Sequence, residues 1–261
     1  MTLRVEQIDD PNQFAGLREE WNKLALKTES AQFFQTHDWL TVYWKHYGQD
    51  QRMRILLVRD NDRIIGIVPL VIRYERRQVG NLATLTYPLD DWGSFYHPIT
   101  TDAARTMSAV VHYLNQNQKD WQLLSWRWCD SNHPATTAIE AAMADAGMRT
   151  FDSVRETSAI IDLPPSYDDY LAQRGSKFRN NVKRWTRRAN ELGELRFEKY
   201  RPHASGKPLP RWDLFDVCVD LAAKSWQGSS ETGTTLSHES IQAFLRDVHE
   251  AAARIGALDL N

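Results

Sequence analysis

A run of basic residues near the middle of the chain has the clearest potential for chemistry. Seven lysine and arginine residues lie between Arg174 and Arg188, and no acidic residue interrupts them. A solvated helix usually alternates opposite charges four residues apart, because like charges repel. A field of one sign attracts phosphate or other anionic groups. We therefore predict a ligand-binding surface, and the residues we single out in it are Lys177, Arg179, Asn180 and Arg184. The alternative interpretation is a solvated helix face.

Three further positions could contribute to a site, each with a structural alternative. Asp90 and Asp91, followed by Trp92, come after a predicted strand and could orient a sugar or amine acceptor, or simply form a turn. His97, which precedes a proline, is either a general base or a loop histidine. Trp226 lies at a predicted helix end and is either a core residue or the wall of an acceptor groove.

The spacing of apolar residues predicts the elements that must position these side chains. Alternation with period two indicates strands, and spacings of three and four indicate helices. In order, we expect a strand at 2–8, helices at 14–24 and 37–47, strands at 53–58, 63–74 and 79–86, a helix at 102–116, a strand at 121–128, a helix at 133–146 and a strand at 158–163. Pro69 in the fifth of these predicts a bulge or a place where sheet pairing stops.

The remainder of the chain predicts a long basic helix and then a weaker repeat of the opening elements. Ser166, three residues before Asp169, resembles a capping box at a helix start, and Gly193 ends the pattern. One side of this helix is apolar: Leu171, Phe178, Val182, Trp185, Ala189 and Leu192. A strand at 195–200, helices at 211–226 and 237–255, and a strand at 257–260 should follow.

Composition excludes several classes of protein. The 261 residues carry a net charge of only −2, so the protein as a whole has no strong attraction to nucleic acid or to anionic membranes, and any such attraction must be local. The first residues lack the apolar core of a signal peptide, and no run approaches the roughly 20 apolar residues of a membrane span. Cys129 and Cys218 lie far apart, without neighbouring metal ligands. We expect a cytoplasmic protein without a metal site.

Four short segments resemble the CelD-like, BioF-like acetyltransferase domain family, a FemAB-related branch of the GNAT superfamily. They are residues 34–40 (FQTHDWL), 66–70 (GIVPL), 176–181 (SKFRNN) and 225–228 (SWQG). The order of predicted elements is similar to a GNAT fold. The resemblance implies an α/β (α+β) protein with a mixed central sheet flanked by helices. It implies a GNAT-like domain at 1–163, a basic linking helix at 164–193 and the first half of a second GNAT-like domain at 194–261.

The same resemblance implies an activity. Members of this family are associated with exopolysaccharide, cellulose or other cell-envelope biosynthesis, so we expect transfer of an acyl group from acyl-CoA, such as acetyl-CoA, to a saccharide or envelope precursor. The alternatives are FemAB-like aminoacyl transfer from charged tRNA, in which the basic helix would contact RNA phosphates, and a non-catalytic accessory protein. No catalytic residue is identified from the sequence. Because the second sheet stops at Asn261, we expect this form to be catalytically silent.

One departure from the family pattern concerns the donor. GNAT enzymes hold the donor pyrophosphate on backbone N–H groups of a glycine-rich loop that opens a helix. The corresponding loop of this chain has Gly93 alone. The first domain is therefore not expected to hold acyl-CoA in the usual way.

Overall fold

The protein is described by a computed structural model that covers residues 3–89, 92–93, 95–117, 119–203 and 209–261. The chain forms two units. The larger joins Met1–Thr150 with Arg201–Asp259, and the smaller consists of Phe151–Tyr200 with Leu260–Asn261. These limits differ from the predicted domains, and the interpretation of the C-terminal segment as the start of a second GNAT-like domain stays a prediction.

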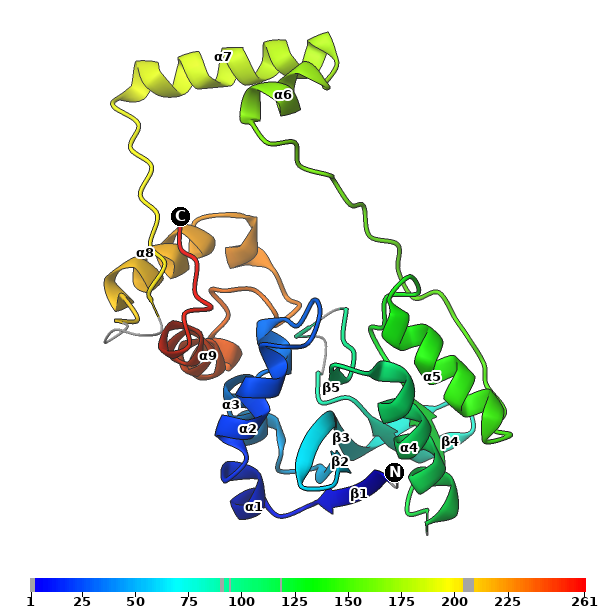
Figure 1. The fold of residues 1–261 in the computed structure, drawn as a ribbon. Helices are drawn as coiled ribbons and strands as arrows, with labels where there is room; N and C mark the ends of the chain where they lie inside the picture. Colours follow the sequence, from blue (N-terminus) through cyan, green and yellow to red (C-terminus); the bar gives the residue numbers. More distant parts are fainter. Residues whose placement is uncertain (1–2, 90–91, 94, 118, 204–208) are drawn as a thin grey trace. The chain divides into compact units, whose positions relative to one another are not determined.

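A six-stranded mixed sheet forms the centre of the larger unit, which confirms the predicted fold class (Figure 1). Its strands lie in the order β1-β2-β3-β4-β6, with β5 paired to β3. Only the β4–β6 pair is parallel, with Thr86 opposite Ser125. The strands are β1 (Leu3–Ile8), β2 (Arg52–Asp60), β3 (Arg63–Arg77), β4 (Gly80–Thr86), β5 (Ile99–Thr100) and β6 (Leu123–Ser125).

The predicted hairpin is the β2–β3 pair, and it turns at Asn61, whose φ of 53° is the left-handed value that a two-residue hairpin loop favours. Pro69 lies opposite Ile55 in this pair. On its other edge, β3 pairs with β5 at Gly66 and Ile67 and with β4 only from Val71 onward. Pro69 thus occupies the gap between two partners, where its missing N–H costs no ladder hydrogen bond. The predicted stop in pairing is confirmed on this edge of β3, while pairing with β2 continues through Pro69.

Alternating side chains of the strands enter two separate cores, one on each face of the sheet. Ile55 and Leu57 pack with residues of α2 (Arg18–Ala25) and α3 (His37–Tyr47). Leu56 and Val58 pack with residues of α4 (Ala103–Gln116) and α5 (Pro134–Asp145). The two-residue period of the strands therefore requires helices on both faces.

The C-terminal helices begin and end close to their predicted limits. They are α8 (Trp212–Ala223) and α9 (Gln242–Arg254), with short 3-10 turns η2 (Trp226–Ser229) and η3 (Glu239–Ile241) between them. Phe244 of α9 joins the core that contains α3, so this segment packs on the first part of the chain. The short elements α1 (Pro11–Ala15) and η1 (Phe33–Gln35) complete the larger unit.

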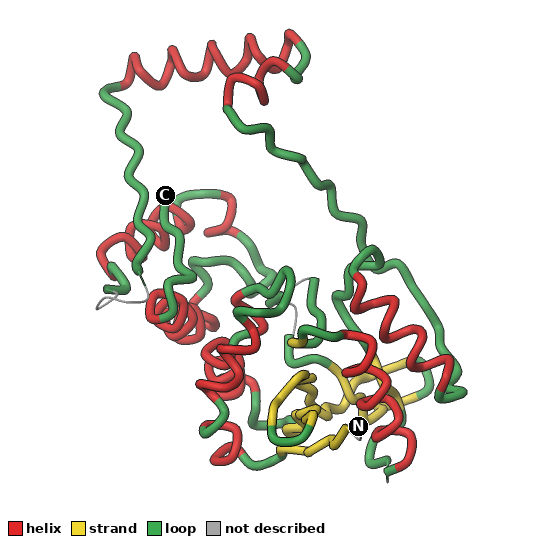
Figure 2. The backbone as a smooth tube through the Cα atoms, in the orientation of Figure 1, coloured by secondary structure: helices red, strands yellow, loops and turns green. Residues whose placement is uncertain are grey.

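Four predicted strands are wrong or much shorter than expected. Residues 158–163 form an exposed loop, and residues 195–200 and 257–260 share only the single bridge between Tyr200 and Leu260 (Figure 2). The predicted strand at 121–128 is reduced to β6. An alternating pattern becomes a strand only where another strand is in place to satisfy its backbone N–H and C=O groups, and residues 158–163 have no such neighbour.

The smaller unit contains the basic segment as two helices rather than one. They are α6 (Tyr167–Ala172) and α7 (Ser176–Leu192). Ser166 caps α6 as predicted, because its Oγ accepts a hydrogen bond from the Asp169 N–H at 3.1 Å. Gly175, extended at ψ 155°, is the N-cap of α7 and separates the two helices.

Candidate functional site

The predicted basic residues lie together on α7 and are largely exposed. Lys177, Asn180 and Arg184 are exposed, and Arg179 is half-buried. Within the described part of the chain, neither Lys177 nor Arg184 forms an ion pair or hydrogen bond. Because Lys177 and Arg184 are seven residues apart, their side chains project from the same side of the helix.

Arg179 differs from its neighbours because its guanidinium closes the corner between α6 and α7. Its Nη1 donates to the carbonyl of Ala172 at 3.4 Å and to that of Arg174. Ala172 is the last residue of α6, and Arg174 lies in the short link to α7. The last carbonyls of a helix lack a partner within it, so Arg179 supplies a donor there. Arg174 in turn stacks its guanidinium 4.3 Å above the ring of Tyr170. Two of the seven basic residues therefore have a structural role that the sequence pattern did not reveal.

The predicted loop residues belong to the larger unit, whereas α7 belongs to the smaller one. Asp90 and Asp91 lie outside the described residues. Trp92 packs between α3 and α9: its Nε1 donates to Tyr47 Oη at 3.0 Å, and its ring centre lies 4.8 Å from that of Phe244. Trp92 is thus anchored in an aromatic cluster.

The glycine of this loop is explained by packing rather than by phosphate binding. A Cβ at Gly93 would lie 2.9 Å from Leu89 Cδ2 and 3.2 Å from Phe34 Cγ. Only glycine fits against these two side chains without a shift. This contact gives no support to a phosphate cradle at Gly93.

Trp226 is not a core residue, since 74% of its surface is exposed. It begins η2, whose N-cap is Ser225: the Ser225 Oγ accepts from the Gln227 N–H at 3.2 Å. The interpretation of Trp226 as a core residue is wrong, and its role in an acceptor groove stays a prediction.

His97 has the surroundings of a structural histidine. Only 4% of it is exposed, and it stacks on His133 with ring centres 4.2 Å apart. Its Nδ1 lies 3.0 Å from Gln35 Nε2. Burial lowers the pKa of His97, so the ring is neutral around pH 7. Its Nε2 lies 3.4 Å from the Ser30 carbonyl oxygen, so groups of the chain already meet both ring nitrogens and neither is free to take a proton from a substrate.

Two buried donors without an acceptor lie at the ends of the parallel strands, and the sequence analysis missed both. Tyr87 directly follows β4 and Trp126 directly follows β6, with ring centres 5.3 Å apart. The Tyr87 Oη and the Trp126 Nε1 are buried, and among the described residues neither has a hydrogen-bond partner. Leaving a buried donor unpaired costs roughly 1–3 kcal/mol. A pair of such groups at adjacent strand ends is therefore a candidate for binding an acceptor atom from outside the chain.

The groups around these donors favour hydrogen bonding rather than nucleophilic attack. Burial raises the pKa of Tyr87 well above its ordinary value, so the phenol keeps its proton. Burial also raises the pKa of the nearby Cys129 thiol to about 12. A thiol that holds its proton at neutral pH is a poor nucleophile.

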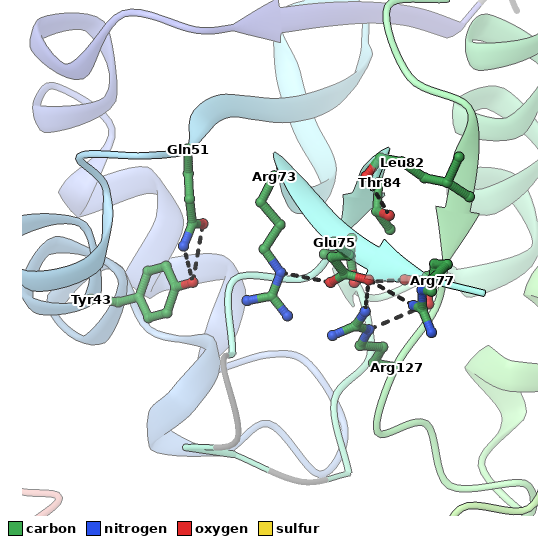
Figure 3. Close-up of polar contacts among 10 residues, drawn as sticks. Tyr43, Gln51, Arg73, Glu75, Arg77, Leu82, Thr84 and Arg127 are labelled. Atoms are coloured by element: carbon green, nitrogen blue, oxygen red, sulfur yellow. Dashed lines mark hydrogen bonds and ion pairs between the residues drawn. The ribbon is translucent and has the colours of Figure 1, made fainter. Parts of the chain in front are cut away.

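An ion cluster on the sheet fixes the segment that carries Trp126 (Figure 3). Glu75 accepts from Arg73 Nε at 2.8 Å, from Arg77 Nη2 at 2.6 Å and from Arg127 Nη2. Burial alone would raise the pKa of Glu75, but the three guanidinium groups lower it overall. Since Arg127 directly follows Trp126, this cluster ties the donor segment to β3. The alternation of residues 73, 75 and 77 places them on one face, but nothing in the sequence assigns Arg127 to them.

Comparisons with known proteins give no match: no family model, curated protein or solved structure is similar to this chain. Within the residues that the structure describes, no three His, Cys, Asp or Glu side chains are grouped so that they could hold a metal ion. In the same residues, every helix is too short or too polar to cross a bilayer.

Proposed function

We propose that this protein is a GNAT-type acyltransferase that uses acyl-CoA as donor. The observation that carries the proposal is the pair of unsatisfied donors, Tyr87 Oη and Trp126 Nε1, at the carboxyl ends of β4 and β6. Ligands of open α/β sheets bind outside the carboxyl ends of the strands. The order of elements from β1 to α5 adds support, because it follows the order that the family resemblance implies.

The chemistry of acyl transfer requires the groups that this site offers. The acceptor nitrogen or oxygen attacks the thioester carbonyl, the C–S bond breaks, CoA leaves as the thiol, and the acceptor loses a proton to a base. The carbonyl oxygen becomes negatively charged in the transition state, and fixed donors in a buried setting stabilise it. Tyr87 and Trp126 would donate to that oxygen. No residue is assigned as the base.

The acceptor class rests on the family resemblance alone: a saccharide or cell-envelope precursor, as in exopolysaccharide biosynthesis. In aminoacyl transfer from charged tRNA, Tyr87 and Trp126 would donate hydrogen bonds to the carbonyl oxygen of the aminoacyl ester. The two reactions therefore differ in the substrate that supplies the acyl group, acyl-CoA or aminoacyl-tRNA. A non-catalytic accessory protein would need neither the Tyr87 hydroxyl nor the Trp126 N–H to stabilise a carbonyl oxygen.

The test measures acetyl-CoA binding by calorimetry and release of the free thiol with a colorimetric reagent. The variant is Tyr87→Phe, which keeps the ring and removes only the hydroxyl. We expect three- to tenfold weaker binding, for the loss of one neutral hydrogen bond of about 1 kcal/mol, and a decrease of 10²-fold or more in any thiol release. Tyr74→Phe is the matched control, because Tyr74 is exposed.

Three results would count against acyl-CoA as the donor. They are no acetyl-CoA binding, equal binding by Tyr87→Phe and the unchanged chain, and turnover with aminoacyl-tRNA but not with acyl-CoA. The last result would move the assignment to the tRNA-dependent reaction.

A further inference from the structure

One side of α7 carries an apolar stripe that the smaller unit covers only in part. Phe178, Trp185 and Leu192 are spaced seven residues apart and are 41%, 54% and 92% exposed. The short helix α6 meets the stripe at its first residue, since the ring of Tyr170 packs edge-on against Phe178 with ring centres 6.4 Å apart. On the neighbouring flank, Leu171 and Val182 line an open groove of about 630 Å³. Exposure of a tryptophan and a phenylalanine on one helix side indicates an interaction surface rather than chance.

Basic side chains without partners run along the edge of this stripe. Lys177, Arg184 and Arg188 are spaced by seven and four residues and lie beside Phe178 and Trp185. Within the described residues, none of these three cations forms an ion pair or hydrogen bond. The only ion pair along α7 in that part of the chain is the loose one of Arg187 with Glu191, at 3.6 Å. The stripe and its basic edge therefore form one amphipathic surface.

We propose that this surface of α7 binds an anionic membrane surface. Lys177, Arg184 and Arg188 would contact the phosphates of acidic phospholipids, while Phe178 and Trp185 would enter the headgroup layer. A helix with a strong basic face and aromatic residues on the other, but low overall hydrophobicity, lies in the plane of such an interface. The charge is complementary, since acidic lipid surfaces attract clustered Lys and Arg within a Debye length.

Other kinds of binding partner would contact only the cations or only the apolar stripe of this surface. A small phosphate-bearing ligand would neutralise the cations and leave the apolar stripe in water. An apolar protein surface would cover the stripe and leave three cations without partners. Single-stranded RNA could do both, because bases stack on aromatic side chains, and it therefore becomes an outcome of the test.

The test is co-sedimentation of the full chain with vesicles of phosphatidylcholine alone or mixed equally with phosphatidylglycerol. We expect binding to the anionic vesicles only, weakened by salt. The triple variant Lys177→Gln, Arg184→Gln, Arg188→Gln should lose affinity about a hundredfold, from roughly a factor of five per cation near the surface. Trp185→Ala should lose about tenfold, because the aromatic ring no longer enters the interface.

Matched controls come from the same chain. The triple variant Lys27→Gln, Arg63→Gln, Lys224→Gln removes three exposed cations from the larger unit, and Trp226→Ala removes a tryptophan that is even more exposed than Trp185. Both should bind vesicles like the unchanged chain, and circular dichroism should show that all variants keep their helices.

The inference fails if the anionic vesicles do not bind, if the α7 variants and the controls behave alike, or if Trp185→Ala binds normally. Binding of single-stranded RNA but not of vesicles, lost in the α7 triple variant, would assign the surface to nucleic acid and overturn it too. Acetyl-CoA binding in the α7 variants is measured in parallel. It should stay unchanged, so that failure here is distinguishable from failure of the proposed acyltransferase function.

Discussion

The buried carboxylate of Asp38 lies 3.5 Å from the guanidinium of Arg254, and this contact ties α9 to the N-terminus of α3. The same carboxylate accepts from Arg18 Nη2 at 3.0 Å and from Asn22 Nδ2 at 2.8 Å. Asp38 itself is only 3% exposed. One acidic side chain thus joins α2, α3 and α9.

We expect Asp38→Ala to destabilise the larger unit by about 3 kcal/mol, since at least two hydrogen bonds to a charged group are lost. Urea denaturation followed by circular dichroism measures this change. The control is Arg254→Gln: its contact is long and Arg254 is half exposed, so its loss should cost less than about 1 kcal/mol. Equal effects of the two changes would contradict the central role of Asp38.

Removal of the Tyr87 hydroxyl should have opposite effects on stability and on function. Because the Oη is buried without a partner, Tyr87→Phe should raise the free energy of unfolding, by up to about 1–3 kcal/mol. Tyr43 is equally buried, but its hydroxyl bonds to Gln51 at 3.1 Å, so Tyr43→Phe should lower stability. Thermal denaturation compares the two variants. A destabilised Tyr87→Phe would show that its hydroxyl has a partner inside the protein.

Stability should decrease as the pH falls from about 7 toward 5. Burial lowers the pKa of His37, whose Nε2 lies 2.9 Å from the carbonyl oxygen of Phe14. Burial also lowers the pKa of His97 and His249. The unfolded chain therefore takes up protons near the ordinary histidine pKa of about 6.5, before the folded state does, and this uptake favours unfolding.

The effect is measured as the difference between the midpoints of urea unfolding at pH 7.5 and at pH 5.5. This difference should be smaller in His37→Gln than in the unchanged chain. The exposed His112 provides the control, since His112→Gln should leave the difference unchanged. An unchanged difference in His37→Gln would assign the pH dependence to other groups.

Arg179 and Arg184 should separate structure from binding on α7. Arg179→Gln removes the donor that closes the end of α6, so the α6–α7 corner should open and amide exchange of residues 167–174 should become faster. Arg184→Gln, from an exposed position without partners, should leave exchange unchanged. Hydrogen exchange measured by mass spectrometry distinguishes the two. The same exchange rates in both variants would show that Arg179 does not hold the corner.

Local pattern alone was sufficient for most of the larger unit. The period-two alternation of β2 and β3 and the three-four spacing of α3 and α4 each predicted an element close to its observed limits. These features depend only on residues that are close in the sequence, so the sequence alone is enough to predict them. The position of Pro69 at a break in pairing belongs to the same class, because the missing N–H is a property of the residue itself.

Tertiary structure alone decided the contacts between distant segments. Arg127 reaches Glu75, Tyr87 lies beside Trp126, and Phe244 of α9 enters the core that contains α3. The failed strand at 158–163 has the same cause, since its alternation was correct but no neighbouring strand completes its hydrogen bonds. A sequence determines which residues can be buried or paired locally. Which distant partner each residue meets depends on how the sheet and helices pack, because that packing alone determines which buried polar groups are satisfied and which, like Tyr87 Oη, are left open.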